Sequence, residues 1–204
     1  MWVKLGMELI FGQEITSEDI RGALMLDYES YHDEYHLMYE RCLDYQRRNP
    51  YIYTMLKDRG EIVGYINFSP VTEAAYERLR RGEIDTFVSG ADILPMRDHT
   101  AYDIYLSSIV VRDDYRGRGC AGRMMQAVVS EWSKLATERD VTVRRIVADA
   151  ISPGGAHLCE ALGLRCVAHT DRDTLTYELI LQPFSGAETP LNRPLLHPKK
   201  EEER

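Results

Sequence analysis

Long apolar runs and a basic excess are both missing from this sequence. No stretch approaches the roughly 20 apolar residues that a membrane-spanning helix needs. Because 33 acidic residues outnumber 25 lysines and arginines, the formal net charge is -8. Such a charge argues against a general nucleic-acid binder, which needs a basic face to displace phosphate counterions, and mildly favours cationic partners such as amines. We therefore expect neither a nucleic-acid partner nor a membrane role.

Paired cysteines and metal-binding spacings are also missing. The four cysteines are Cys42, Cys120, Cys159 and Cys166, and none forms a C-x-x-C motif. The first residues lack the apolar run and the small-residue cleavage site of a signal peptide, so we expect a reduced, cytoplasmic protein. His32 and His36 stand four residues apart without the glutamate spacing of a zinc helix, and we predict no metal.

The composition predicts one globular domain followed by a polar tail. With 204 residues, of which 44% are hydrophobic and 28% charged, the chain is long enough to bury a sizeable core. The end of the sequence is rich in proline and closes with KKEEER, a block that cannot bury enough apolar area to order itself. We expect a folded domain over residues 1–182 and a flexible tail over residues 183–204.

Apolar periodicity and turn residues predict an alternation of short strands and helices. The strands are expected at residues 7–12, 51–57, 61–68, 105–111, 145–150 and 174–181, with a further short strand open at 166–169. The helices are expected at residues 17–28, 33–48, 72–81, 119–136 and 153–162. The turn Asp58-Arg59-Gly60 predicts an antiparallel β-hairpin, and residues 82–100 read as a long polar connection.

Residues 105–136 carry the most specific signal, because a β-branched strand runs through a charged, glycine-rich turn into a helix. The turn contains Arg116, Gly117, Arg118, Gly119 and Gly122. The glycines let the backbone turn tightly, so that amide N–H groups at the helix N-terminus can face an anion, and the arginines add positive charge there. This pattern is typical of a pyrophosphate site.

The same glycines also satisfy the G-x-G-x-x-G fingerprint of a dinucleotide-binding fold. That fold would need several further β-α units after the motif, whereas only short strands remain, and a hairpin precedes it. A P-loop is excluded more firmly, because no Gly-Lys-Ser/Thr follows the glycines. The dinucleotide interpretation is therefore the weaker one.

The segment Arg116-Gly117-Arg118-Gly119-Cys120-Ala121 resembles the signature Arg/Gln-x-x-Gly-x-Gly/Ala of the GNAT superfamily of N-acetyltransferases. The preceding strand IVVRDDYRGRG is similar too, and Leu162-Gly163-Leu164 stands where the family has Leu-Gly-aromatic. The resemblance covers roughly residues 15–181. It implies an α/β fold with a central mixed, mostly antiparallel sheet of six to seven strands and about four flanking helices.

The resemblance implies acetyl-CoA as the co-substrate and assigns residues to it. Backbone amides of residues 116–122 would hold the pyrophosphate, and the strand at 109–111 would pair with the pantetheine arm. A backbone N–H near Ile109 or Val110 would stabilise the tetrahedral oxyanion. The expected cofactor-binding residues are Ile109, Val110, Val111, Arg116, Gly117, Arg118, Gly119, Cys120, Ala121 and Gly122.

The resemblance leaves the catalytic residues open. An alkylammonium, with a pKa of about 10.4, must lose a proton before it attacks, so a base or a water chain is expected. Asp103, ahead of the fourth strand, and Asp149, at the end of the fifth, are the candidate bases, although either could serve a local structural role. Cys159 replaces the tyrosine with which many family members protonate the departing thiolate, and it is either a proton donor or a small buried helix residue.

Two functions follow from this interpretation. The first is an acetyltransferase that moves an acetyl group from acetyl-CoA to a primary amine of a small molecule or protein by direct attack. The alternative is a catalytically weak acyl-CoA-binding sensor or partner-binding protein. The acceptor would be selected by residues 28–50 and 70–103, whose carboxylates suit a cation. A homodimer is left open, because family members often pair through their late strands.

Overall fold

The computed structural model describes residues 6–31, 36–83, 88–170 and 172–181. The strands are β1 (Glu8–Phe11), β2 (Tyr53–Asp58), β3 (Glu61–Val71), β4 (Ala101–Val111), β5 (Thr142–Ala150), β6 (Arg165–His169) and β7 (Leu175–Ile180). The helices are α1 (Ser17–Ser30), α2 (Tyr39–Arg48), α3 (Glu73–Arg80), α4 (Cys120–Arg139) and α5 (Pro153–Ala161). The predicted tail and its boundary at residue 182 lie outside the described residues.

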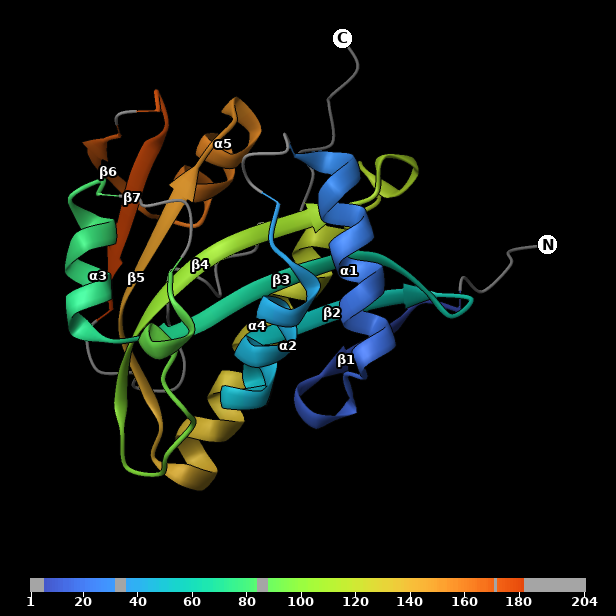
Figure 1. Ribbon diagram of the computed structural model, residues 1–204, viewed down its shortest axis with the longest axis horizontal. Helices are drawn as coiled ribbons and strands as arrows, with labels where there is room; N and C mark the ends of the chain where they lie inside the picture. The colour runs from blue at the N-terminus through green and yellow to red at the C-terminus, as the bar shows by residue number, and fades with distance from the viewer. Residues whose placement is uncertain (1–5, 32–35, 84–87, 171, 182–204) are drawn as a thin grey trace, which may run out of the picture.

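The strands form one twisted sheet in the order β1-β2-β3-β4-β5-β7-β6 (Figure 1). The pair β4 and β5 is parallel, and every other neighbouring pair is antiparallel. The predicted mixed, mostly antiparallel α/β fold is confirmed, including the hairpin between β2 and β3. The described residues contain five helices, one more than the four that the resemblance implies.

Several predicted boundaries were wrong by three residues or more, among them those of the second helix and the fourth strand. The helix expected over residues 33–48 begins only at Tyr39, and residues 33–35 lie outside the described residues. Residues 36–38 are not helical, because His36 and Leu37 bond instead to the last turns of α1, through the Tyr31 carbonyl and the Tyr28 hydroxyl. The fourth strand begins at Ala101, four residues before its predicted start at 105, because residues 101–104 pair with β5.

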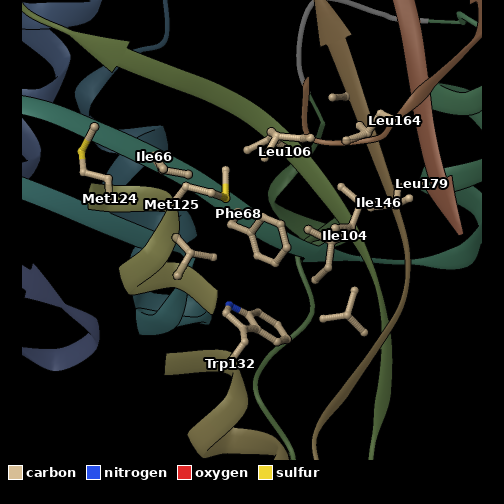
Figure 2. Close-up of a cluster of buried hydrophobic side chains, with 14 of the residues drawn as sticks. Ile66, Phe68, Ile104, Leu106, Met124, Met125, Trp132, Ile146, Leu164 and Leu179 are labelled. Carbon is tan, nitrogen blue, oxygen red and sulfur yellow. The ribbon is translucent and has the colours of Figure 1, made fainter. Parts of the chain in front are cut away.

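The sheet lies between two helical layers. Helices α1, α2 and α3 cover one face, and α4 and α5 cover the other, each over its own apolar core. On the α4 face, the Trp132 ring packs edge-on against Phe68 at 5.3 Å and Tyr102 at 6.5 Å between centroids (Figure 2). This packing holds α4 against the sheet and fixes its N-terminus beside the end of β4.

The first helix begins where the sequence predicts it. The Asp19 carboxylate accepts a hydrogen bond from the Thr16 backbone N–H at 2.9 Å, and the Thr16 hydroxyl accepts one from the Asp19 N–H at 3.3 Å. This reciprocal cap satisfies backbone donors that the first turn leaves open. None of the helices in the described parts of the chain has the length and apolar character that a bilayer crossing requires.

Candidate functional site

The parallel strands β4 and β5 separate before they end. Their pairing runs from Ala101 opposite Thr142 to Leu106 opposite Ala148 and stops there, although β4 continues to Val111. Figure 1 shows the two strands running together and then diverging toward the top of the view. The β5-facing edge of residues 107–111 therefore meets no strand, and its backbone groups are open to a ligand.

A bulge lies at the point of separation. Asn67 of β3 pairs with Ser108 and Phe68 pairs with Leu106, so Ser107 is an extra residue in β4. A bulge bends a strand and reverses the alternation of its side chains. Ser108 consequently shares the α1 face with Tyr105, and its hydroxyl interacts there with the Tyr31 phenol.

A cavity of about 990 Å³ occupies the gap between the separated strands. It reaches both faces of the sheet, because its lining includes side chains from both apolar cores. On the α4 and α5 face the lining includes Leu106, Cys120, Met125, Ala148, Leu158 and Cys159. On the α1 face it includes Tyr31, Leu37, Tyr45, Val88, Ile93, Tyr105 and Val110. The split in the sheet therefore joins two chemically different spaces.

The N-terminus of α4 forms one wall of this cavity. Gly117 and Gly119 adopt the left-handed backbone conformation, with φ of 71° and 76°. A Cβ added at either glycine would meet no atom within 4 Å, so the space in front of the turn is open. The first turn of α4 contains no acidic residue, and its unpaired N–H groups together with the helix dipole favour an anion there. The turn therefore fits a phosphate group.

Nine of the ten residues predicted to bind the cofactor line the cavity: Ile109, Val110, Val111, Arg116, Gly117, Gly119, Cys120, Ala121 and Gly122. The tenth, Arg118, does not, because its guanidinium lies over the ring of Tyr115 at 5.1 Å from the centroid. The Arg116 side chain is exposed and lies 2.9 Å from Asp113, so its charge stays at the mouth of the cavity.

Asp149 lies at the separated end of β5 and lines the cavity. Its carboxylate accepts a hydrogen bond of 2.8 Å from the Thr174 hydroxyl. Burial raises the pKa of Asp149 above its ordinary value, while the Thr174 bond and the charge of Arg172 oppose that rise. A carboxylate whose pKa is raised accepts a proton more readily than an ordinary one, so the structure is compatible with its predicted role.

Asp103 lies away from the cavity, contrary to the predicted position near the cleft. It is the third residue of β4, and its fully buried carboxylate contacts Arg144 at 2.8 Å and Arg145 at 2.7 Å. Arg145 also contacts Glu77 at 2.7 Å, so this cluster ties α3 to β4 and β5. Both oxygens of Asp103 are held by guanidinium groups, and its position does not suit a base for the reaction.

Cys159 lines the cavity from α5 and is only 6% exposed. Burial, together with the charges of Asp149 and Glu160, raises the pKa of its thiol to about 11. The side chain therefore keeps its proton at neutral pH. It is the small buried helix residue of one interpretation, and its thiol lines the cavity. The proton-donor role stays a prediction.

The structure adds a cluster on the α1 face that the sequence analysis did not identify. Asp27 of α1 lines the cavity, is 6% exposed, and accepts a short hydrogen bond from the Tyr65 hydroxyl. Burial raises the pKa of Asp27 to about 6, although the Tyr65 bond and the nearby His36 act in the opposite direction. A signal was present in the sequence, because Asp27 follows Ile20 and Leu24 on the apolar face of the helix.

Comparisons with known proteins identify the family. The sequence matches the model of the acetyltransferase (GNAT) family over residues 17–152, and no curated protein sequence matches it significantly. Ard1 from Thermoplasma volcanium is 14% identical with a TM-score of 0.57, covering 86% of this chain and 98% of its own. The loading GNATL domain of CurA from Lyngbya majuscula is 11% identical with a TM-score of 0.63, covering 85% and 97%. Arabidopsis thaliana NAA60, in complex with a bisubstrate analogue, is 14% identical with a TM-score of 0.54, covering 85% and 97%.

The family model covers two thirds of the sequence, including α4, the glycine-rich turn and both separated strands. At these low identities the solved structures establish the fold alone. The family match agrees with the sheet order, with the split between β4 and β5, and with the glycine-rich turn at the start of α4. The chain belongs to the acetyltransferase (GNAT) family.

Proposed function

We propose that this protein transfers the acetyl group of acetyl-CoA to a primary amine by direct attack. One observation carries the proposal: a single cavity passes through the split sheet from the anion-binding turn of α4 to a space lined by carboxylates and tyrosines. A cavity with two such ends suits two substrates that meet in the middle. The Arabidopsis thaliana NAA60 structure, which shares the fold, holds a bisubstrate analogue and supports this arrangement.

The donor would bind along α4 and β4. Backbone N–H groups of residues 116–122 would hold the pyrophosphate, with Arg116 adding charge at the entrance. The open edge of residues 109–111 would pair with the pantetheine arm as an additional strand would. The acetyl carbonyl would then lie beside the bulge, where a backbone N–H near Ile109 or Val110 would stabilise the developing oxyanion.

The acceptor would lose its proton to Asp149. As the amine nitrogen bonds to the acetyl carbon, the C–S bond breaks and its electron pair leaves with sulfur. The ammonium first gives one proton to the Asp149 carboxylate, and the nitrogen releases its second proton to solvent after it has bonded to the acetyl carbon. The Thr174 hydroxyl, which bonds Asp149, lies 2.6 Å from the Thr170 hydroxyl, and both threonines line the cavity. These hydroxyls form a hydrogen-bonded path from Asp149 toward the turn between β6 and β7.

The leaving group would depart as a thiolate. A free thiol has a pKa of about 8.5, whereas burial raises the pKa of Cys159 to about 11. Proton transfer from Cys159 to the CoA thiolate would therefore be uphill by roughly 3 kcal/mol. Because a thiolate is already a fair leaving group near neutral pH, the reaction does not require Cys159 as an acid.

The first experiment is calorimetric titration with acetyl-CoA and, in parallel, with dinucleotides. The variant carries Arg116→Glu and Gly119→Glu, which place two carboxylates at the proposed pyrophosphate site. The control carries Arg59→Glu and Gly60→Glu in the β2–β3 turn, where Gly60, like Gly119, has positive φ and both residues lie outside the cavity. We expect tight acetyl-CoA binding that only the first variant loses. Binding of dinucleotides but not of acetyl-CoA would overturn the proposal.

The second candidate function is a CoA-binding sensor with weak turnover. The cysteine at position 159, where many family members have a tyrosine, motivates it, because turnover would then depend on unassisted departure of the thiolate. Free-thiol release from acetyl-CoA in the presence of a panel of amines separates the two functions. Amine-dependent release supports the transferase, whereas tight acetyl-CoA binding without such release supports the sensor.

A further inference from the structure

Two carboxylates, Asp27 and Asp149, lie in the cavity, and they differ in their surroundings. Asp149 has the Thr174 hydroxyl and the charge of Arg172 nearby. The groups that act on Asp27 are the Tyr65 hydroxyl, from β3, and His36, which follows α1. Neither arginine nor lysine is among them, so Asp27 is a buried anion that lacks a strong permanent counter-charge in the part of the chain that the structure describes.

Four other described carboxylates are buried, and one of them, Asp58, resembles Asp27 in accepting a hydrogen bond from a tyrosine hydroxyl but does not line the cavity. Three of them hold a permanent cation: Asp19 with Lys57 at 2.7 Å, Asp103 with Arg145 at 2.7 Å, and Glu178 with Arg80 at 2.8 Å. A buried charge is costly unless it is paired. Asp27 differs from these three because it opens onto a cavity, through which a ligand can deliver the cation.

The Asp27 carboxylate lies close to the point of transfer. The Ser108 hydroxyl interacts with Tyr65, and the Tyr65 hydroxyl donates in turn to Asp27. Because each hydrogen bond spans about 2.8 Å between oxygens, the Ser108 hydroxyl and the Asp27 carboxylate lie at most about 6 Å apart. Ser108 directly precedes Ile109, whose backbone is proposed to hold the acetyl carbonyl. A small molecule can therefore reach both places.

Aromatic rings line the path between the two carboxylates. Tyr31, Tyr45 and Tyr105 all line the cavity, and the Tyr105 phenol is within electrostatic reach of Asp149 as well as of the other two rings. Ring faces attract ammonium groups through their quadrupole. The overall net charge of -8 also favours the approach of cations.

We propose that Asp27 binds a second ammonium group of the acceptor, so that the preferred acceptor is a short α,ω-diamine. The proposal rests on the proposed function, because it deepens the assignment of the acceptor. An extended chain advances by about 1.2 Å per bond, so the five bonds of 1,4-diaminobutane separate its nitrogens by about 6 Å. One nitrogen then lies at Asp27 while the other meets the acetyl group beside Asp149.

The test is a binding measurement that does not need turnover. The protein is saturated with CoA, which lacks the acetyl group, and is titrated with 1,4-diaminobutane or with 1-aminobutane. The variant is Asp27→Asn, which keeps an oxygen acceptor for the Tyr65 hydroxyl while removing the charge. The control is Glu18→Gln, which removes the same charge from an exposed position on the same helix, away from the cavity.

We expect the diamine to bind at least about tenfold more tightly than the monoamine, as for one added charge-assisted hydrogen bond. In Asp27→Asn the diamine affinity falls to that of the monoamine, and in Glu18→Gln it does not. Equal affinities in the unaltered protein, or a diamine preference that survives Asp27→Asn, would overturn the proposal. If Asp27 only ties α1 to β3 through Tyr65, Asp27→Asn will not change the ratio of the diamine affinity to the monoamine affinity.

Thiol release from acetyl-CoA distinguishes this failure from failure of the proposed function. If 1-aminobutane and 1,4-diaminobutane release CoA equally well, with equal KM values, acetyl transfer stands and the diamine assignment is refuted. If the diamine binds through Asp27 but no amine releases CoA, the anchor stands and the transferase assignment is refuted.

Discussion

The uncompensated charge of Asp27 should make the fold less stable as the pH rises. The change to test is Asp27→Asn, which is nearly isosteric and leaves Tyr65 a hydrogen-bond acceptor. Burial raises the pKa of Asp27 from an ordinary value of 3.8 to about 6. The folded protein therefore binds this proton more tightly than the unfolded chain does. Between about pH 4 and pH 6 the unfolded chain releases this proton while the folded protein retains it, so stability falls as the pH rises through this window.

The size of the effect follows from the shift in pKa. A shift of about two units corresponds to roughly 3 kcal/mol, since each unit is worth about 1.36 kcal/mol. Well below pH 4 the carboxyl is neutral in both states, and the variant and the unaltered protein should have similar stability. Above pH 6.5 we expect Asp27→Asn to raise the free energy of unfolding by about 1–3 kcal/mol, because the new amide needs partners of its own.

The assay is urea unfolding of the variant and the unaltered protein at several pH values between 4 and 8. Asp19→Asn on the same helix provides a control, because ionisation of Asp19 has the opposite effect on the stability of the fold. Burial alone would raise the pKa of Asp19, but Lys57 and Thr16 together hold it below its ordinary value. Its ionised form therefore stabilises the fold above about pH 4 and loses that contribution as the pH falls through the folded pKa. Asp19→Asn should accordingly destabilise the protein near pH 7.

The difference in stability between Asp27→Asn and the unaltered protein isolates the titration of Asp27 from that of the other carboxylates. If this difference is constant from pH 4 to pH 8, Asp27 does not titrate as proposed. If Asp27→Asn is destabilising near pH 7, the carboxylate has a compensating cation, and the reasoning behind the diamine anchor is refuted too.

Three further predictions concern the reaction and the packing of α4, whose first turn is the glycine-rich turn. Asp149→Asn should lower kcat by about 10²- to 10⁴-fold while leaving acetyl-CoA affinity unchanged, as expected for loss of a general base; steady-state kinetics and calorimetry check this, and an unchanged kcat would exclude Asp149. Cys159→Ala should change kcat by less than about threefold, because a thiol with a pKa of about 11 is a poor acid; a kcat loss of about a hundredfold would restore it as the proton donor. Trp132→Ala should cost about 3–5 kcal/mol of unfolding free energy, because it empties the edge-on contacts with Phe68 and Tyr102; chemical unfolding measures it, and a loss below about 1 kcal/mol would contradict the packing argument.

The local parts of the proposed cofactor site could be predicted from the sequence. The left-handed turn at Gly117 and Gly119 and the start of α4 depend on residues that are neighbours along the chain. Glycine permits positive φ, and the helix that follows supplies the open N–H groups, so a short motif specifies both. Nine of the ten predicted cofactor residues accordingly line the cavity, and only the orientation of Arg118 could not be foreseen.

The acceptor side of the cavity could be predicted much less well. Asp103 was a reasonable candidate from its place in the chain, but Arg144 and Arg145, about forty residues later, hold it away from the cavity. Asp27 was overlooked because its exposure to the cavity depends on how α1 packs over β3. Such assignments require contacts between residues far apart in the sequence, which periodicity and motifs do not encode.

The sequence by itself determined the alternation of strands and helices, the glycine-rich turn and the family, because these depend on local backbone preferences and short spacings. Only the tertiary structure decided where the sheet divides, since the parallel pairing of β4 with β5 stops at Leu106 and Ala148 while both strands continue. That division creates the cavity and brings Asp27 and Asp149 to it from opposite parts of the chain. The chemistry of the acceptor site is therefore a property of packing, because burial and charge pairing are set by neighbours in space.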